Sequence, residues 1–489
     1  MKVIVRITAL MLALLMLASL FAACGNESKP TKKPAGTVAV TDGVKSLSSI
    51  NWGGEEYRVL GNQSDNKGFH NFEIDYEEMP EDVVGLAVWN RNNKIKEVYG
   101  LDIVGTLVDT AADTAQLFLD AGEDTYDLIV VHNRVVLNFA TKGYLANLNK
   151  VEYINFENDC WDLDVNEQFT YGNKLYYTTN KFLLQDKHRT WINWYNRSLA
   201  NELKVGRLED EVFAGTWTID RLIEIAKTCS SNTDGVEGMT STDTWGFVSS
   251  DPFTFGVLAY GVGFRLSNIG ADGYPQLIGA TDQMLSALDK VFELSADQTI
   301  SFFSEYRPTA DENVAGLGSS VFNEGRAVVM GHCLSYLDNL GKIDFEYGVL
   351  PNPKYNEAQE EYISVPNIGN GYLFAIPTTV NDIDKAGFGL EALSEESVDT
   401  SYREYIETRC KLQDSYDEDM AKCLTIIFDG ISYDVAMIDD LGGLGKLMHT
   451  QLLKSGANTY ARQYDKLAKK AANQLKSIKE DFEKLDALN

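Results

Sequence analysis

The chain has 489 residues, 44% of them hydrophobic, and its 72 acidic and 43 basic residues give a formal net charge of −29. This excess of acid argues against nucleic-acid binding and against adsorption to a membrane through a basic surface, since both need a basic footprint. The length exceeds what one hydrophobic core supports and predicts two or three domains.

The N-terminal segment reads as a leader. A basic flank precedes the apolar residues 7–23, which are followed by Cys24. A spanning helix needs about 20 apolar residues, so this shorter run predicts a secretory signal. Residues 20–24 (LFAAC) resemble the lipobox of bacterial lipoproteins, with Phe21 in place of the usual aliphatic residue. The resemblance implies that Cys24 is lipidated, carrying palmitate, and that it anchors the chain at the extracellular face of the cell membrane. The alternative is an ordinary signal peptide with a chance cysteine.

A polar segment follows the leader. Residues 25–50 are rich in Gly, Ser, Thr, Lys and Pro and hold few large apolar side chains. Such a segment buries too little surface to offset its chain entropy. It is predicted to be a disordered tether.

Cysteines and histidines show no metal-binding or redox pattern. The five cysteines of the body are odd in number and widely spaced, without a Cys-x-x-Cys pair: Cys160, Cys229, Cys333, Cys410 and Cys423. Buried free thiols are predicted, and one disulfide stays an alternative. The histidines lack metal-ligand spacing, so neither a metal nor a cofactor is expected.

The first part of the body alternates between strand and helix patterns. Strands are predicted at 57–60, 101–104 and 126–131, and helices at 87–99, ended by Gly100, and at 114–121. This order predicts an α/β fold with a parallel sheet covered by helices. Ligands of such sheets bind at the carboxyl ends of strands, where Asn62, His132 and Asn133 fall.

A second alternation begins near residue 172. Strands are predicted at 174–180, 191–196, 245–248, 327–330 and 371–377, and residues 346–350 read as a crossing segment. Helices are predicted at 199–203, at 219–228 with Thr218 as N-cap, at 255–260 and at 281–295. From residue 382 the pattern is almost wholly helical and ends in a charged helix at 460–485.

Five short segments, in chain order, resemble the bacterial extracellular solute-binding proteins of family 1, the maltose-binding-protein type. They are GNKLYY (172–177), WYNRSL (194–199), TWTIDRL (216–222), FNEGRAVVMG (322–331) and YGVLPNP (347–353). The resemblance implies a two-lobe periplasmic-binding-protein-like fold of type II, with hinged lobes and a ligand cleft between them. Lobe one is expected at 51–177 and 351–410, and lobe two at 178–350 and 411–489. Crossings are expected near 177–181, near 348–351 and before the last helical block.

The same resemblance implies a function. We expect a lipoprotein of an ABC transporter that captures a carbohydrate, an oligosaccharide in the first place, and delivers it to permease subunits without catalysis. The expected partners are thus a small-molecule sugar, the permease and, through the lipid, the membrane, and the protein is expected to be a monomer. Two alternatives stay open, a tethered sensor that binds ligand without transport and a secreted glycoside hydrolase. A hydrolase needs a carboxylate pair across a cleft, and no hydrolase, metalloprotease or phosphate-loop motif is present.

Sugar binding needs flat aromatic faces for the ring and polar side chains for its hydroxyls. Besides Asn62, His132 and Asn133, the candidates near strand ends, near the first crossing or after the FNEGRAVVMG segment are Asn180, Trp191, Trp245, Phe253, Tyr260, His332 and Tyr336. Tyr260 is compatible with either core or pocket. Trp194 and Trp217 lie inside the resembling segments and are predicted to be packing residues, and Asp186 reads as a solvated loop residue.

Overall fold

The computed structural model describes residue 47 and residues 50–63, 70–249, 253–303, 317–339, 343–367, 371–412 and 415–488, within the unit Val38–Asn489. The predicted leader, Cys24 and most of the predicted tether lie outside the described residues. Leu47, inside the predicted tether, is buried, so core packing begins before residue 50. In the described ranges, no helix combines the length and the apolar character needed to cross a membrane.

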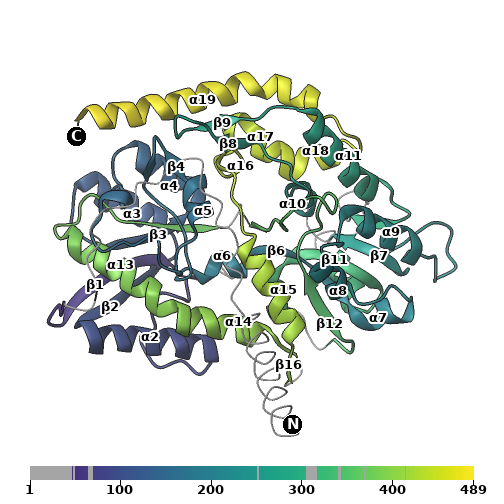
Figure 1. Ribbon diagram of the computed structural model, residues 1–489, viewed down its shortest axis with the longest axis horizontal. Coiled ribbons are helices and arrows are strands. Elements are labelled where there is room, and N and C mark those ends of the chain that lie inside the picture. The colour runs from purple at the N-terminus through teal and green to yellow at the C-terminus, as the bar shows by residue number, and fades with distance from the viewer. Residues whose placement is uncertain are drawn as a thin grey trace, which may run out of the picture. The chain divides into compact units, whose positions relative to one another are not determined.

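The first lobe is built on a four-stranded sheet with the order β14-β3-β1-β2 (Figure 1). Its strands are β1 (Glu55–Asn62), β2 (Leu101–Val108), β3 (Leu128–His132) and β14 (Tyr372–Ala375). Strand β1 pairs in parallel with β2 and β3, as predicted, whereas β14 returns from far along the chain and pairs antiparallel to β3. Helices α2 and α13 pack together against β2 and β1, and α3 and α4 pack against β3. These helices are α2 (Val83–Tyr99), α3 (Ala111–Ala121), α4 (Asn133–Thr141) and α13 (Ile383–Ser397).

The second lobe is built on a larger sheet with the order β10-β7-β11-β6-β12, and β13 also pairs with β6. Its strands are β6 (Thr190–Asn196), β7 (Trp245–Ser249), β10 (Ser301–Phe303), β11 (Ala327–Cys333), β12 (Tyr347–Leu350) and β13 (Val365–Pro366). Strands β7, β10 and β11 are parallel to one another, and β6 runs antiparallel to β11 and β12. Both sheets are therefore mixed.

Helices surround the second sheet and fill the C-terminal part of the chain. Those around the sheet or between the lobes are α5 (Leu163–Gln168), α6 (Leu184–His188), α7 (Arg197–Glu202), α8 (Leu208–Ala214), α9 (Ile219–Cys229), α10 (Phe253–Gly261), α11 (Asp282–Ala296) and α12 (Leu317–Asn323). The C-terminal helices are α14 (Arg403–Arg409), α15 (Glu418–Asp429), α16 (Val435–Ile438), α17 (Leu444–Lys446), α18 (Leu452–Lys454) and α19 (Tyr460–Leu488). A π-helical turn, η7 (Leu447–Gln451), joins α17 to α18.

Local chemistry sets the helix ends that the sequence predicts. Helix α2 ends at Gly100, whose φ of 63° is left-handed and whose N–H donates to the carbonyl of Lys96. At the start of α9 the Thr218 hydroxyl accepts from the N–H of Arg221 at 3.4 Å. Both predicted caps are confirmed.

The chain crosses between the two sheets more than once. Thr178 still pairs with Phe374 of the first sheet and Thr190 opens β6, so the first crossing lies between these two residues. The second crossing differs. Strands β12 and β13 both pair with β6, so the chain returns to the first sheet only after Pro366, later than the predicted 348–351. Strand pairing with β6 holds residues 347–366 on lobe two.

The lobes also touch through two hairpins beneath α19. In β4–β5 (Thr170–Tyr171, Lys174–Leu175), the N–H of Gly172 donates at 2.9 Å to Gly273 in the turn of β8–β9 (Ser267–Ile269, Pro275–Leu277). Phe482 of α19 stacks on Tyr176 at 5.1 Å, beside the first hairpin. Helix α19 therefore packs on both hairpins, since Lys479 also pairs with Asp272 beside the second.

The two tryptophans predicted to be packing residues and the five cysteines lie in the core. Trp194 and Trp217 are fully buried, and their indole N–H groups donate to Cys333 and Pro351 carbonyls at 3.2 and 2.9 Å. Their predicted packing role is confirmed. All five cysteines of the body are buried and free, which removes the disulfide alternative.

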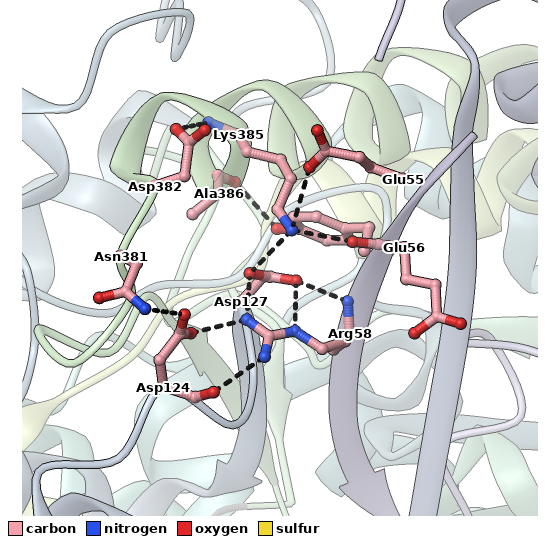
Figure 2. A network of polar contacts seen from close by, with 10 residues as sticks. Glu55, Glu56, Arg58, Asp124, Asp127, Asn381, Asp382, Lys385 and Ala386 are labelled. Atoms are coloured by element: carbon pink, nitrogen blue, oxygen red, sulfur yellow. Dashed lines mark hydrogen bonds and ion pairs between the residues drawn. The ribbon is translucent and has the colours of Figure 1, made fainter. Parts of the chain in front are cut away.

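A polar network ties β1, the start of β3 and α13 together (Figure 2). The guanidinium of Arg58 donates to both Asp127 and Asp124, and the Arg58 N–H also donates to Asp127 at 2.8 Å. Lys385 of α13 lies 3.6 Å from Asp127 and donates to the carbonyl of Glu56. The bonds to Asp127 raise the pKa of Arg58, although burial acts against them. Because β1 and β3 are parallel, this network lies at the amino ends of the strands, opposite the edge where ligands are expected.

Candidate functional site

At the carboxyl end of β3 the chain passes into α4 without a loop. His132 is the N-cap of α4, and its Nδ1 accepts from the N–H of Arg134 at 3.2 Å. The His132 ring also meets Tyr372 of β14 edge to face at 6.0 Å. His132, Asn133 and Arg134 thus lie together at the sheet edge that the sequence singles out.

Four of the aromatic candidates meet on the second lobe. Trp191 pairs with Cys333 across β6 and β11, and the Trp191 ring stacks on His332 at 5.6 Å and 24°. The His332 ring also lies 4.4 Å from Tyr336, and the Phe253 ring lies 6.5 Å from Trp191. A fifth ring, His449 of η7, meets Phe253 at 4.7 Å. These rings form what we call the aromatic cluster: Trp191, Phe253, His332, Tyr336 and His449.

The rings of the aromatic cluster differ in exposure. Trp191 and His449 are 2% and 4% exposed, and Tyr336 is also buried. Phe253 and His332 are partly exposed. Phe253 and His332 are therefore the rings of the cluster that a molecule can contact, and the buried Trp191 packs against both.

The electrostatic environment of His449 includes a charge from lobe one. Burial lowers the pKa of His449 to about 3, and repulsion by the nearby Arg134 of lobe one acts in the same direction. The Arg134 charge at the start of α4 therefore acts on a ring of the aromatic cluster. Burial also raises the pKa of the Tyr336 hydroxyl, so both groups stay uncharged near neutral pH.

Two buried polar side chains beside this region make no hydrogen bond. Asn133 is 1% exposed, and neither its amide nitrogen nor its oxygen has a partner. His449 likewise lacks a partner for either ring nitrogen. Buried polar groups are nearly always paired, so each unpaired group needs an explanation.

The other candidates have structural partners or lie elsewhere. Asn62 lies at the same sheet edge, but its side chain donates to Asp109 and accepts from the N–H of Ala111. Asn180 donates to Ser394 at 2.8 Å and accepts from the N–H of Phe182. These two amides are occupied within the protein itself.

Trp245 and Tyr260 also belong to the interior. Trp245 is fully buried at the amino end of β7, where it donates to the Thr240 carbonyl and packs on Phe302. Tyr260 is 1% exposed and donates to Asp434 at 2.9 Å. Asp186, read from the sequence as solvated, is instead 1% exposed and paired with Lys187 at 2.8 Å.

A cavity of about 440 Å³ lies apart from the aromatic cluster. It is bounded by the first crossing, by Trp161, by Tyr402 just before α14 and by Phe428 of α15. Its walls carry Asp186 and Lys187, which already pair with each other. The candidate Asn180 also lines this cavity, whereas the aromatic candidates Trp191, Phe253, His332 and Tyr336 lie in the aromatic cluster.

Buried carboxyls also lie away from the aromatic cluster. Burial raises the pKa of Glu391 to about 8, but Glu391 accepts from Asn158 and Trp161. Glu209, whose pKa burial raises to about 7, pairs with Arg197. Among the described residues, no group of three or more His, Cys, Asp or Glu side chains is placed to hold a metal ion.

No protein-family model matches the chain, and no curated protein matches it. Solved structures of other proteins do match the chain. A cyclo/maltodextrin-binding protein in complex with maltotetraose matches 93% of this chain and 98% of its own, with a TM-score of 0.53 and 14% identity. The maltose-binding periplasmic protein MalE from Listeria monocytogenes, in complex with maltose, matches 87% and 98%, with a TM-score of 0.53 and 13% identity. UspC of M. tuberculosis matches 85% and 99%, with a TM-score of 0.53 and 13% identity.

These likenesses identify the class of fold. The chain has the two-lobe α/β fold of the type II periplasmic binding proteins. The fold class expected from the sequence is therefore confirmed.

Proposed function

We propose that this protein captures a carbohydrate, an oligosaccharide in the first place, between its two lobes and passes it to the permease subunits of an ABC importer. The observation that carries the proposal is the aromatic cluster of lobe two, in which Phe253 and His332 are partly exposed. Partly exposed rings match the apolar faces of sugar rings, and unpaired polar groups match hydroxyls. Two proteins of the same fold are in complex with maltose and maltotetraose. As part of this proposal, lipid on Cys24 holds the protein at the outer face of the membrane, where it works as a monomer without catalysis.

A thermal screen tests the proposal directly. Among neutral mono- and oligosaccharides, at least one is expected to raise the unfolding temperature, because a ligand that binds only the folded state stabilises it by mass action. At 100 times the dissociation constant the gain is about 2.7 kcal/mol. Calorimetry then gives the affinity of each hit. Peptides and polyamines serve as comparison ligands, and a response to these alone would contradict sugar capture.

Phe253→Ala is expected to weaken the binding of any sugar found in the screen by roughly 1–3 kcal/mol, because a partly exposed ring for stacking is lost. Titration calorimetry measures the change. Phe213→Ala is the matched control, since Phe213 is 41% exposed on α8 and lies outside the aromatic cluster. Equal affinity in the two variants would rule out stacking on Phe253.

A further inference from the structure

We infer that His449 is a specificity-determining ligand contact, hydrogen-bonding through its uncharged imidazole to hydroxyl groups of a neutral sugar. The inference rests on the proposed function. It adds His449, which is not among the ligand-binding residues predicted from the sequence.

Position is the first support. His449 lies on η7, which packs against α10, and its ring meets Phe253, the first residue of α10. Arg134 of lobe one contributes to the electrostatic environment of His449. A ligand between the lobes that stacks on Phe253 therefore comes within reach of the imidazole.

Unsatisfied hydrogen bonding is the second support. Both nitrogens of His449 are buried without a partner, so the unliganded protein bears the cost of desolvating them. A neutral imidazole has one donor and one acceptor. A pair of sugar hydroxyls supplies the complement of both, whereas an apolar ligand supplies neither.

The backbone around His449 is the third support. Residues Leu447–Gln451 form a π-helical turn between two short α-helices. Such turns interrupt regular hydrogen bonding, cost stability and occur frequently at functional sites. Here the turn packs the His449 ring against α10, where it meets Phe253.

Two substitutions distinguish a ligand contact from a structural role. His449→Leu removes both nitrogens and keeps a good helix former of similar size, and His449→Gln keeps one donor and one acceptor. We expect His449→Leu to unfold at or above the wild-type temperature without ligand, since it removes an unpaired buried polar group. For the sugars that bind wild-type protein, starting with maltotetraose as probe, we expect an affinity loss of about 10- to 100-fold in His449→Leu and a smaller loss in His449→Gln.

The inference predicts that His449→Leu keeps or raises the unfolding temperature without ligand and at the same time lowers the affinity for sugar. Lower stability of unliganded His449→Leu, or wild-type affinity in that variant, would overturn it. If the proposed function itself is wrong, the wild-type protein binds no sugar of the panel, and this result differs from a failure of the His449 inference alone. If Phe253→Ala loses affinity and His449→Leu does not, sugar capture stands and the role of His449 falls.

Discussion

Replacing Asp127 with alanine is expected to lower the free energy of unfolding by about 3–5 kcal/mol, the effect typical of removing one partner of a buried ion pair. The Asp127 carboxylate is 2% exposed and accepts from the N–H and the guanidinium of Arg58. It also faces Lys385, so its loss leaves two cations without their buried partner (Figure 2).

The network itself provides a control for this prediction. Asp124 binds the same Arg58 guanidinium, but the Asp124 side chain is 24% exposed. Asp124→Ala is expected to cost under about 1 kcal/mol, because water screens exposed ion pairs. Urea unfolding followed by tryptophan fluorescence measures both. A similar small cost for the two variants would show that burial does not set the strength of this network.

Glu73→Gln is expected to stabilise the protein at about pH 8 by about 3 kcal/mol and to leave it nearly unchanged at about pH 4.5. Burial raises the pKa of Glu73 from 4.5 to about 7, and nearby Asp186 adds to the shift, although Asn71 and Arg91 act against it. Glu73 is fully buried, and its Oε2 has no hydrogen-bond partner.

The sign follows from proton binding. Between pH 4.5 and about pH 7 the folded protein keeps a proton on Glu73 that the unfolded chain has released. The folded state then binds more protons, so its stability falls as pH rises through this window by about 1.4 kcal/mol per unit. Glutamine has no proton to lose, so the wild-type decline is absent from the variant.

Urea unfolding of wild type and Glu73→Gln at several pH values measures this difference. Glu77→Gln serves as control because Glu77 is exposed in the same segment, and exposed substitutions change stability little. A Glu73→Gln difference that does not grow with pH would show that Glu73 is ionised in the folded protein.

Local elements of this fold could be predicted from the sequence because their signals are local. The strand and helix patterns of residues 55–132 reproduce the observed order, and Gly100 ends α2 as expected. Pairing could not be predicted in the same way. Strand β14 joins β3 from about 240 residues away and antiparallel, and β13 stays with β6, because such pairings depend on contacts between distant segments.

The residues of the candidate site, too, could be predicted only in part, because their assembly depends on distant contacts. Trp191 and Trp245 have similar strand-like surroundings in the sequence, yet only Trp191 joins the aromatic cluster. What separates them is which end of its strand each residue occupies and which end faces the other lobe. His449 stands in a helical, mostly apolar stretch with no motif around it, so it is recognised only from the tertiary structure, by its contact with Phe253 and its unpaired ring nitrogens.

By itself, the sequence determined the alternation of strands and helices, the caps and the residue types available for a sugar site, since these depend on neighbours within a few turns of chain. The tertiary structure alone decided which aromatic rings meet, where the chain crosses between lobes and which polar groups are buried without partners. Those outcomes depend on the packing of segments hundreds of residues apart, and no local pattern encodes that packing.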